Sequence, residues 1–464
     1  MIRRKRCYII MLAICLGGSF AMQAVAATIS DFVEITPYVE IQSTYNDNIY
    51  EISEDAPLPE DAKERDDLSL DARAGVDANI SLDRTFLSIG AGIRYALQYS
   101  KYVENTNLDG ARHDFDFDFT FSSKYEEGIL QDRVKLSVND VLAFIPIDEE
   151  EPLLAGNTSI RNNFLMGLDY KLISSRRVGL TVGYAYNRMD YFEDEPITVV
   201  TVEGYEDSDA LTQESQTHSG KAELKYVMNS RVTGLLTYNY AFATREEDDG
   251  VLVSANFNRH NVMAGVQTKF TPRMHGTFQS GYTLTSFDSV GDASQDDQND
   301  FVTEASLSAN FAHQPLMTVG YRRYYVENDF GDTLLTDNIF AHMGFRLAQG
   351  FLVNLSGDYI LEGRALYDDD TTQKLFGIDA ELELIKNMNL LAGYNYRRKD
   401  FFAQNFIGET QREETNHNVS SGLQYKIGRH FLVRGLYTYT DKRSNVAEQE
   451  FNRNKFTATG KVIF

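Results

Sequence analysis

Charged side chains recur at every second position along many segments of this sequence. In Phe115-Asp-Phe-Asp-Phe-Thr-Phe121, aromatic residues alternate with Asp116, Asp118 and Thr120. Alternate residues of a β-strand point to opposite faces, so such a strand has one apolar and one charged face. Charges of both signs on one face could set a transverse field across a water-filled passage, or could pair between neighbouring strands. The candidates for this inner, pore-lining face are Arg94, Asp114, Asp116, Asp118, Arg133, Lys135, Arg322, Arg346, Asp379, Glu381, Glu383, Arg397 and Arg434.

Other residue types that carry chemistry form no motif. The eight histidines show neither i, i+4 pairing nor the ligand spacing of a zinc site. The acidic clusters near residues 296–300 and 368–370 lack the loop glycine and terminal glutamate of an EF-hand. No glycine-rich phosphate loop opens a helix, and a catalytic triad is recognised by geometry rather than by chain order. We therefore expect no enzyme, no metal site and no cofactor.

Segments with apolar residues at every second position cover most of the chain. Residues 68–82 show the pattern, with Asp71 and Arg73 on the opposite face. The connectors alternate between short ones, such as residues 83–84, and long ones, such as residues 192–214. Bacterial barrels have short periplasmic turns and long extracellular loops, whereas a soluble β-sandwich does not sort its connectors in this way. The sequence predicts an all-β fold: an antiparallel, up-and-down, transmembrane outer-membrane β-barrel of about 20 strands, with 18 and 22 as alternatives.

The start of the chain has the features of an exported protein. Residues 3–6 are basic, residues 7–16 are mostly apolar, and small residues reach Ala26, so residues 1–26 are predicted to be a cleaved signal peptide. Lipidation at Cys15 is disfavoured because Ile14 precedes it where a lipid-attachment motif needs a small residue. Residues 27–32 would form a short periplasmic segment and residues 33–464 the barrel.

The sequence defines the last strand of the predicted barrel more sharply than the start of the first. The first begins near Val33 or just after Pro37, because proline cannot donate to a strand ladder. The last alternates cleanly up to the terminal aromatic residue, as expected for the closing strand of an outer-membrane barrel. Its Phe456, Val462 and Phe464 are the expected signal for the barrel assembly machinery.

Acidic residues outnumber basic ones. The sequence has 68 Asp and Glu against 44 Lys and Arg, and four of the basic residues belong to the predicted signal peptide. Nucleic acid is an unsuitable partner, because phosphate binding rests on clustered positive charge. Residues 192–214 alone hold eight carboxylates and no Lys or Arg. Such loops fit an acidic extracellular rim beside lipopolysaccharide and divalent cations, or simply solvated loops kept soluble by charge.

Tyrosines gather late in the strands that are predicted to run outward. A tyrosine at the membrane interface buries its ring while its hydroxyl stays in water, so these residues are expected to form an aromatic girdle, with a sugar-stacking platform as the alternative. The girdle candidates are Tyr184, Tyr186, Tyr238, Tyr240, Tyr282, Tyr394, Tyr396, Tyr437 and Tyr439.

The segment that opens the predicted barrel carries a distinctive motif. Residues 36–50 run from a proline-containing alternating strand into Tyr45-Asn46-Asp47-Asn48-Ile49. This opening resembles the Putative beta-barrel porin 2 family, and the architectural resemblance extends to Phe464. The resemblance implies an outer-membrane barrel associated with exopolysaccharide secretion.

Two classes of function fit these features. The leading hypothesis is a porin-like channel in the outer membrane of a Gram-negative bacterium, for passive diffusion or export of a hydrophilic solute, with a preference for cations. Export of a surface polysaccharide, with export components as partners, is its more specific form. The alternative is a non-transporting barrel whose long loops serve adhesion or matrix anchoring. Outer-membrane lipid and lipopolysaccharide are partners in both, and the sequence leaves the oligomeric state open.

Overall fold

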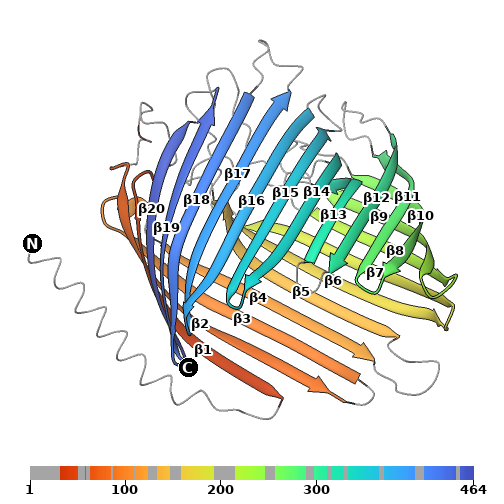
Figure 1. The fold of residues 1–464 in the computed structure, drawn as a ribbon, viewed down its shortest axis with the longest axis horizontal. Coiled ribbons are helices and arrows are strands. Elements are labelled where there is room, and N and C mark those ends of the chain that lie inside the picture. Colours follow the sequence, from red (N-terminus) through yellow and green to blue (C-terminus); the bar gives the residue numbers. More distant parts are fainter. Residues whose placement is uncertain are drawn as a thin grey trace, which may run out of the picture.

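The computed structural model is one antiparallel sheet of 20 strands that closes on itself (Figure 1). Each strand pairs with its neighbours in the chain, and β1 (Val33–Asn46) also pairs with β20 (Phe451–Ile463), so no strand is left at an edge. The predicted barrel and its strand number are confirmed. The structure describes residues 32–50, 58, 63–84, 87–108, 110–123, 133–146, 158–192, 215–245, 256–288, 297–310, 316–327, 333–364, 370–402, 412–445 and 450–464.

The strands follow one another with a single short 3-10 helix, η1 (Thr106–Leu108), among the described elements. The remaining strands are β2 (Asp67–Asp83), β3 (Leu87–Tyr102), β4 (Gly110–Ser123), β5 (Val134–Pro146), β6 (Thr158–Ser174), β7 (Val178–Phe192), β8 (Ser215–Val227), β9 (Val232–Arg245), β10 (Phe257–Thr271), β11 (Met274–Phe287), β12 (Gln298–Asn310), β13 (Leu316–Glu327), β14 (Thr333–Ala348), β15 (Phe351–Arg364), β16 (Asp370–Ile385), β17 (Met388–Phe402), β18 (Arg412–Ile427) and β19 (Phe431–Ser444).

The first strand includes its proline. β1 begins at Val33, so the alternative start after Pro37 is wrong. The ladder between β1 and β20 begins at Tyr38, one residue later, and the Pro37 carbonyl accepts a hydrogen bond from the Phe464 amide at 3.0 Å. Proline is tolerated here because only its acceptor is used on this side. The predicted signal peptide and the acidic stretch 193–214 lie outside the described residues.

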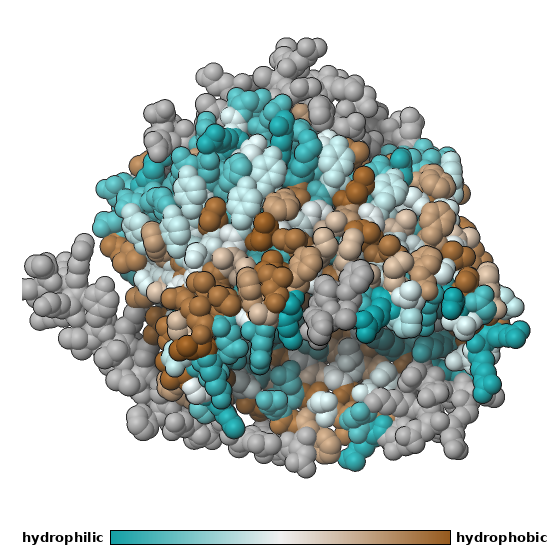
Figure 2. All heavy atoms as spheres, viewed as in Figure 1, coloured by the Kyte–Doolittle hydropathy of each residue, from teal (hydrophilic) through white to brown (hydrophobic). Residues whose placement is uncertain are grey.

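The wall has two chemically distinct faces. Directly opposite residues of an antiparallel ladder point to the same side, so the register carries the face assignment from strand to strand. One face bears exposed apolar side chains such as Ile93, Leu236, Phe278 and Ile339, and this is the outer face. Figure 2 shows it as a hydrophobic band with hydrophilic residues on both sides. Among the described residues, no helix has the length and apolar character needed to cross a bilayer.

The short connectors are tight turns. Three of them place one residue in the left-handed region of backbone space, at Gly350 (φ 78°), Asn387 (φ 70°) and Gly428 (φ 65°). Glycine reaches this region without a steric cost, and asparagine is the residue that tolerates it next best. The register also shifts by one residue beside four of the turns, as in β14 between Arg346 and Ala348. The turns therefore fix the register that decides which side chains face inward.

Candidate pore lining and aromatic girdle

The inner face of the first two strands is organised around a buried tyrosine. Tyr38 is 3% exposed and its ring covers Gly75, where a Cβ atom would lie 2.5 Å from the ring carbon Cζ. The Lys461 ammonium lies 3.9 Å from the ring centroid and 3.7 Å from Glu40 across the β1–β20 seam. Lys461 lies over the ring and is itself paired with Glu40, so it holds the ring against the wall. The Tyr38 side chain therefore covers this part of the inner face.

Ion pairs continue around the wall from β2 to β4. Arg73 donates to Asp114 at 2.8 Å, over the intervening strand β3. Arg94 lies 3.4 Å from Asp77 on one neighbour and 3.0 Å from Asp116 on the other. The side chain of Arg94 is 61% exposed, so it is solvated on its inner side. The alternative of cross-strand pairing is therefore realised on this wall, and its charges cancel locally.

A second group of inward-facing charges lies on β12 to β15, which are on the near side in Figure 1, whereas β1 to β5 pass behind. Arg322 lies 3.7 Å from Glu304, and its guanidinium lies 4.7 Å from the centroid of Phe340. His342 Nε2 is 3.1 Å from Asp358. This histidine faces the interior as a polar wall residue. Charge pairs thus occur on both sides of the barrel interior.

Acidic residues near the short turns have structural partners. Glu383 accepts a hydrogen bond from the Asn387 amide at 3.3 Å, and Glu381 accepts one from Asn389 at 2.5 Å. Asp379 lies against Gly393, where a Cβ would be 2.9 Å from its Oδ1 atom. All three carboxylates face the interior, and they also stabilise the β16–β17 hairpin.

The register places the predicted pore residues as follows. Arg133 directly precedes β5, and the other twelve lie in strands on the inner face. Arg94, Asp114, Asp116 and Arg322 form the ion pairs described above, and Asp118 covers Gly92. The remaining members of this set are Lys135, Arg346, Arg397 and Arg434.

Tyrosine–histidine pairs repeat on the outer face. His218 lies directly opposite Tyr186, and its Nδ1 atom is 2.7 Å from the hydroxyl of Tyr184. The sequence alone does not reveal these pairs, because only the strand register brings the two residues together. The available signal is a histidine a few residues after the start of β4, β8, β10 and β18, which are four of the strands predicted to run inward. The other pairs are Tyr238 with His260 (2.9 Å), Tyr394 with His417 (3.0 Å) and Tyr95 with His113 (2.8 Å).

The nine girdle candidates all lie on the outer face. Tyr437 donates to Asn454 at 2.7 Å and Tyr240 to Asn258 at 2.9 Å, so several hydroxyls have partners where the rings meet lipid. All nine rings thus lie on the lipid-facing side of the wall, and their position at the membrane interface stays a prediction. The outward-facing members are Tyr184, Tyr186, Tyr238, Tyr240, Tyr282, Tyr394, Tyr396, Tyr437 and Tyr439.

The residues of the predicted assembly signal close the barrel. Phe456 is 52% exposed on the outer face, and its ring centroid is 4.6 Å from that of Tyr437. Val462 lies opposite Val39 and Phe431 on the two neighbouring strands. Phe464 extends past β20 to the Pro37 carbonyl. The apolar alternation of this strand therefore faces lipid.

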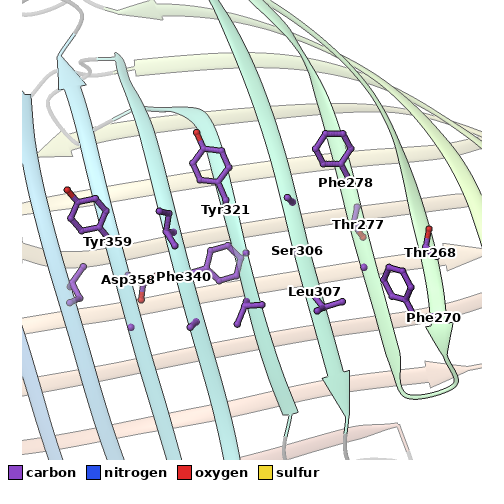
Figure 3. A pocket seen from close by; sticks show the side chains of 18 of the residues that line it. Thr268, Phe270, Thr277, Phe278, Ser306, Leu307, Tyr321, Phe340, Asp358 and Tyr359 are labelled. Carbon is purple, nitrogen blue, oxygen red and sulfur yellow. The ribbon is translucent and has the colours of Figure 1, made fainter.

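A hollow of about 1000 Å³ lies along β10 to β16 (Figure 3). Most of the side chains around it are apolar, including Phe270, Phe278, Leu307, Tyr321 and Tyr359. An apolar lining suits lipid acyl chains better than a hydrophilic solute. Among the described residues, no group of three or more His, Cys, Asp or Glu is arranged to hold a metal ion. Because the hollow is apolar, we place the candidate site for hydrophilic solutes on the polar inner face.

A closed 20-stranded barrel with a lipid-facing apolar band defines an outer-membrane barrel of the porin type. The model of the Putative beta-barrel porin 2 family matches residues 371–463, which confirms this family resemblance over β16 to β20. The N-terminal motif lies outside the matched segment. A search of curated proteins gave no match.

Several solved barrels are similar in structure. The siderophore receptor PirA from Pseudomonas aeruginosa has a TM-score of 0.46 and 10% identity, covering 93% of this chain and 80% of its own. The outer membrane protein opdK from the same organism has a TM-score of 0.40 and 8% identity, covering 93% and 99%. OccAB4 from Acinetobacter baumannii has a TM-score of 0.39 and 13% identity, covering 94% and 99%.

Proposed function

We propose that this protein is an outer-membrane channel through which hydrophilic solutes pass by diffusion. A barrel of this strand number is too wide for wall side chains to fill its interior. All described secondary-structure elements except the one-turn η1 belong to the wall. The observation that supports the proposal most directly is the polar inner face, where Arg94 is 61% exposed and His342 is 52% exposed.

The proposed channel prefers cations. The ion pairs on the inner face cancel charge locally, whereas the whole sequence has a net charge of −24. Much of the excess belongs to long connectors such as residues 192–214. Acidic mouths concentrate cations over distances of about a Debye length, roughly 30 Å at 0.01 M salt and 10 Å at 0.1 M.

Planar-bilayer recording tests the proposal. The purified barrel is expected to conduct, with a reversal potential in a low-salt KCl gradient that shows K⁺ permeating faster than Cl⁻. Replacing the eight carboxylates of residues 192–214 with their amides should reduce this preference while conductance remains. Anion preference would contradict the selectivity.

Absence of conductance would contradict the channel itself. If deletion of residues 192–214 then abolished surface attachment of cells, the protein would be a display barrel.

Export of a surface polysaccharide is the more specific form of this proposal, and it rests on the family resemblance. An acidic mouth repels an anionic polymer, so a neutral polymer, or an anionic one screened by divalent cations, fits best. Loss of surface polysaccharide on deleting the gene, restored by the wild-type chain, is the expected result. The barrel assembly machinery and polysaccharide export components are the proposed partners, and cleavage after Ala26 is the proposed maturation.

A further inference from the structure

Four outward-facing residues form a polar row across β16 to β19. Lys374 lies directly opposite Arg398, Arg398 opposite Thr415, and Thr415 opposite Arg443. Neighbouring strands are about 4.8 Å apart, so the row brings three cations and one hydroxyl within about 15 Å. We call these four residues the outer cation row. The sequence alone does not reveal this row, because charged residues in a strand are first expected on the inner face.

Carboxylates hold the cations of this row. The Nε atom of Arg398 donates to Asp400 at 2.8 Å, and Nη2 donates to Glu413 at 3.0 Å. Arg443 donates from Nε to Asp441 at 3.2 Å. Lys374 lies 3.6 Å from Asp400. Each arginine is thus bound on its Nε edge by a carboxylate two residues away on its own strand, which fixes the plane of the guanidinium.

Two of the three carboxylates in this group are much less exposed than the cations. The side chains of Asp400 and Asp441 are 13% and 16% exposed, whereas those of Arg443, Lys374 and Arg398 are 69%, 47% and 37% exposed. Glu413, at 53%, is the exposed carboxylate of the group. The exposed groups are therefore three cations and one carboxylate, and the shielded Asp400 and Asp441 position the cations.

The position of the row along the strands gives its depth. Tyr396, His417 and Asp441 form the next outward-facing row, which is two residues closer to the middle of these strands. Below it lie Tyr394 and Tyr439. Tyrosine is the residue expected at the boundary between acyl chains and headgroups. Long connectors of such barrels are extracellular, so the outer cation row, at the ends of these strands that lead to long connectors, is expected at the level of the headgroups of the outer leaflet.

We propose that the outer cation row binds the phosphorylated sugar headgroup of lipopolysaccharide. Guanidinium groups recognise phosphate through paired donors, and the Thr415 hydroxyl adds a donor between the cations. The tyrosines below offer apolar surface to the first carbons of the acyl chains. This site faces lipid on the outside of the wall and is independent of the proposed channel.

The same geometry recurs on β7, which supports a role in the membrane rather than a local contact. Arg188 donates from Nε to Asp190 at 2.6 Å, two residues beyond Tyr186 on the outer face. The side chain of Arg188 is 44% exposed and that of Asp190 is 13% exposed. A single arginine makes a weaker site than the row of three cations, so β16 to β19 are the principal site.

Native mass spectrometry of the detergent-purified barrel tests the proposal, with bis-phosphorylated and dephosphorylated lipid A as probes. The wild-type protein should retain the phosphorylated lipid more strongly. The variant Lys374→Gln/Arg398→Gln/Arg443→Gln should bind it at least about tenfold more weakly and lose the distinction between the two lipids. Inorganic phosphate at millimolar concentration should not displace the lipid.

The matched control removes three cations from the opposite face. Lys221→Gln/Lys426→Gln/Arg434→Gln, all inward-facing, should leave lipid A binding unchanged. Heat-dependent gel mobility reports the folding of each variant. If the triple variant misfolds, Arg443→Gln alone is the test, since Arg443 is the most exposed cation and its loss should weaken lipid binding severalfold. Equal affinity of the wild type for both lipids overturns the proposal. So does displacement by inorganic phosphate, or an oligomer that dissociates in the triple variant.

Discussion

Replacing Asp67 with alanine is expected to release the segment after β3 and to speed hydrogen exchange at Val103, Glu104 and Asn105 by about a hundredfold. Asp67 is 3% exposed and accepts hydrogen bonds from all three of these amides, at 3.0, 3.1 and 2.7 Å. It also accepts the side-chain amide of Asn105 at 3.0 Å. Loss of this one buried charged acceptor leaves several hydrogen-bond donors without a partner. The cost is about 3 kcal/mol, which raises the equilibrium constant for local opening about a hundredfold.

Asn105 extends this network to the β1–β2 connector. Its side chain is fully buried, and its carbonyl oxygen accepts the Lys63 amide at 2.8 Å and the Tyr50 hydroxyl at 3.1 Å. Tyr50 is 1% exposed. The two connectors are thus joined by buried hydrogen bonds, so opening one exposes the other. Faster exchange should therefore also appear at the Lys63 and Glu64 amides.

Hydrogen-exchange mass spectrometry in lipid nanodiscs measures this effect. Asp66→Ala is the matched control, because Asp66 accepts an exposed hydrogen bond from the Tyr45 hydroxyl at 3.3 Å. It should leave exchange within about twofold of the wild type. Unchanged protection of residues 103–105 in Asp67→Ala would show that the network does not hold this segment. The chain has no tryptophan, so exchange is more informative than intrinsic fluorescence.

The N-terminal motif of the family resemblance has a physical role at the barrel seam. The Asp47 carboxylate accepts hydrogen bonds from the backbone amide and from the side-chain amide of Asn454, both at 2.6 Å. Asn48 donates to the Asn452 carbonyl at 3.2 Å. The motif therefore ties the first strand to the last at the end of the seam away from the termini. Its polar residues replace ladder hydrogen bonds where β1 ends.

The sequence predicts the barrel well because strand alternation and connector length are local signals. Phe115 to Phe121 and the terminal strand show which residues share a face without any knowledge of partners. Tight turns with Gly350 and Gly428 mark strand ends in the same way. Strand number, topology and the face of each candidate then follow from period two and from antiparallel neighbours.

The contacts of the site depend on register and on distant segments, which alternation does not encode. Arg73 reaches Asp114 across an intervening strand, and Asp47 meets Asn454 from the other end of the chain. A charged residue in a strand also does not always point to the interior of the barrel. Asp140 lies opposite Phe117 and Phe164 on the outer face, although a carboxylate in a strand is first assigned to the interior.

Removing two negative charges from the inner wall is expected to change ion selectivity strongly. The variant Asp114→Asn/Asp116→Asn removes the carboxylate paired with Arg73 and one of the two paired with Arg94, which keeps Asp77 at 3.4 Å. One charge about 7 Å from an ion in water contributes roughly 0.6 kcal/mol, close to thermal energy. Removing two should raise the energy of a cation and lower that of an anion by about 1.2 kcal/mol each, so the K⁺/Cl⁻ permeability ratio should fall by more than about tenfold in 10 mM salt. This prediction rests on the proposed channel.

Salt and a matched control separate this field effect from structural damage. The Asp114 and Asp116 side chains are 40% and 32% exposed, so their ion pairs contribute about 1 kcal/mol or less to stability and the barrel should stay folded. At 1 M KCl, where the Debye length is about 3 Å, the difference should largely vanish. Asp190→Asn/Asp400→Asn makes the same charge change on the outer face and should leave the ratio unchanged. An equal shift in both variants, or one that persists at 1 M, would place the ion path away from the β2–β4 wall.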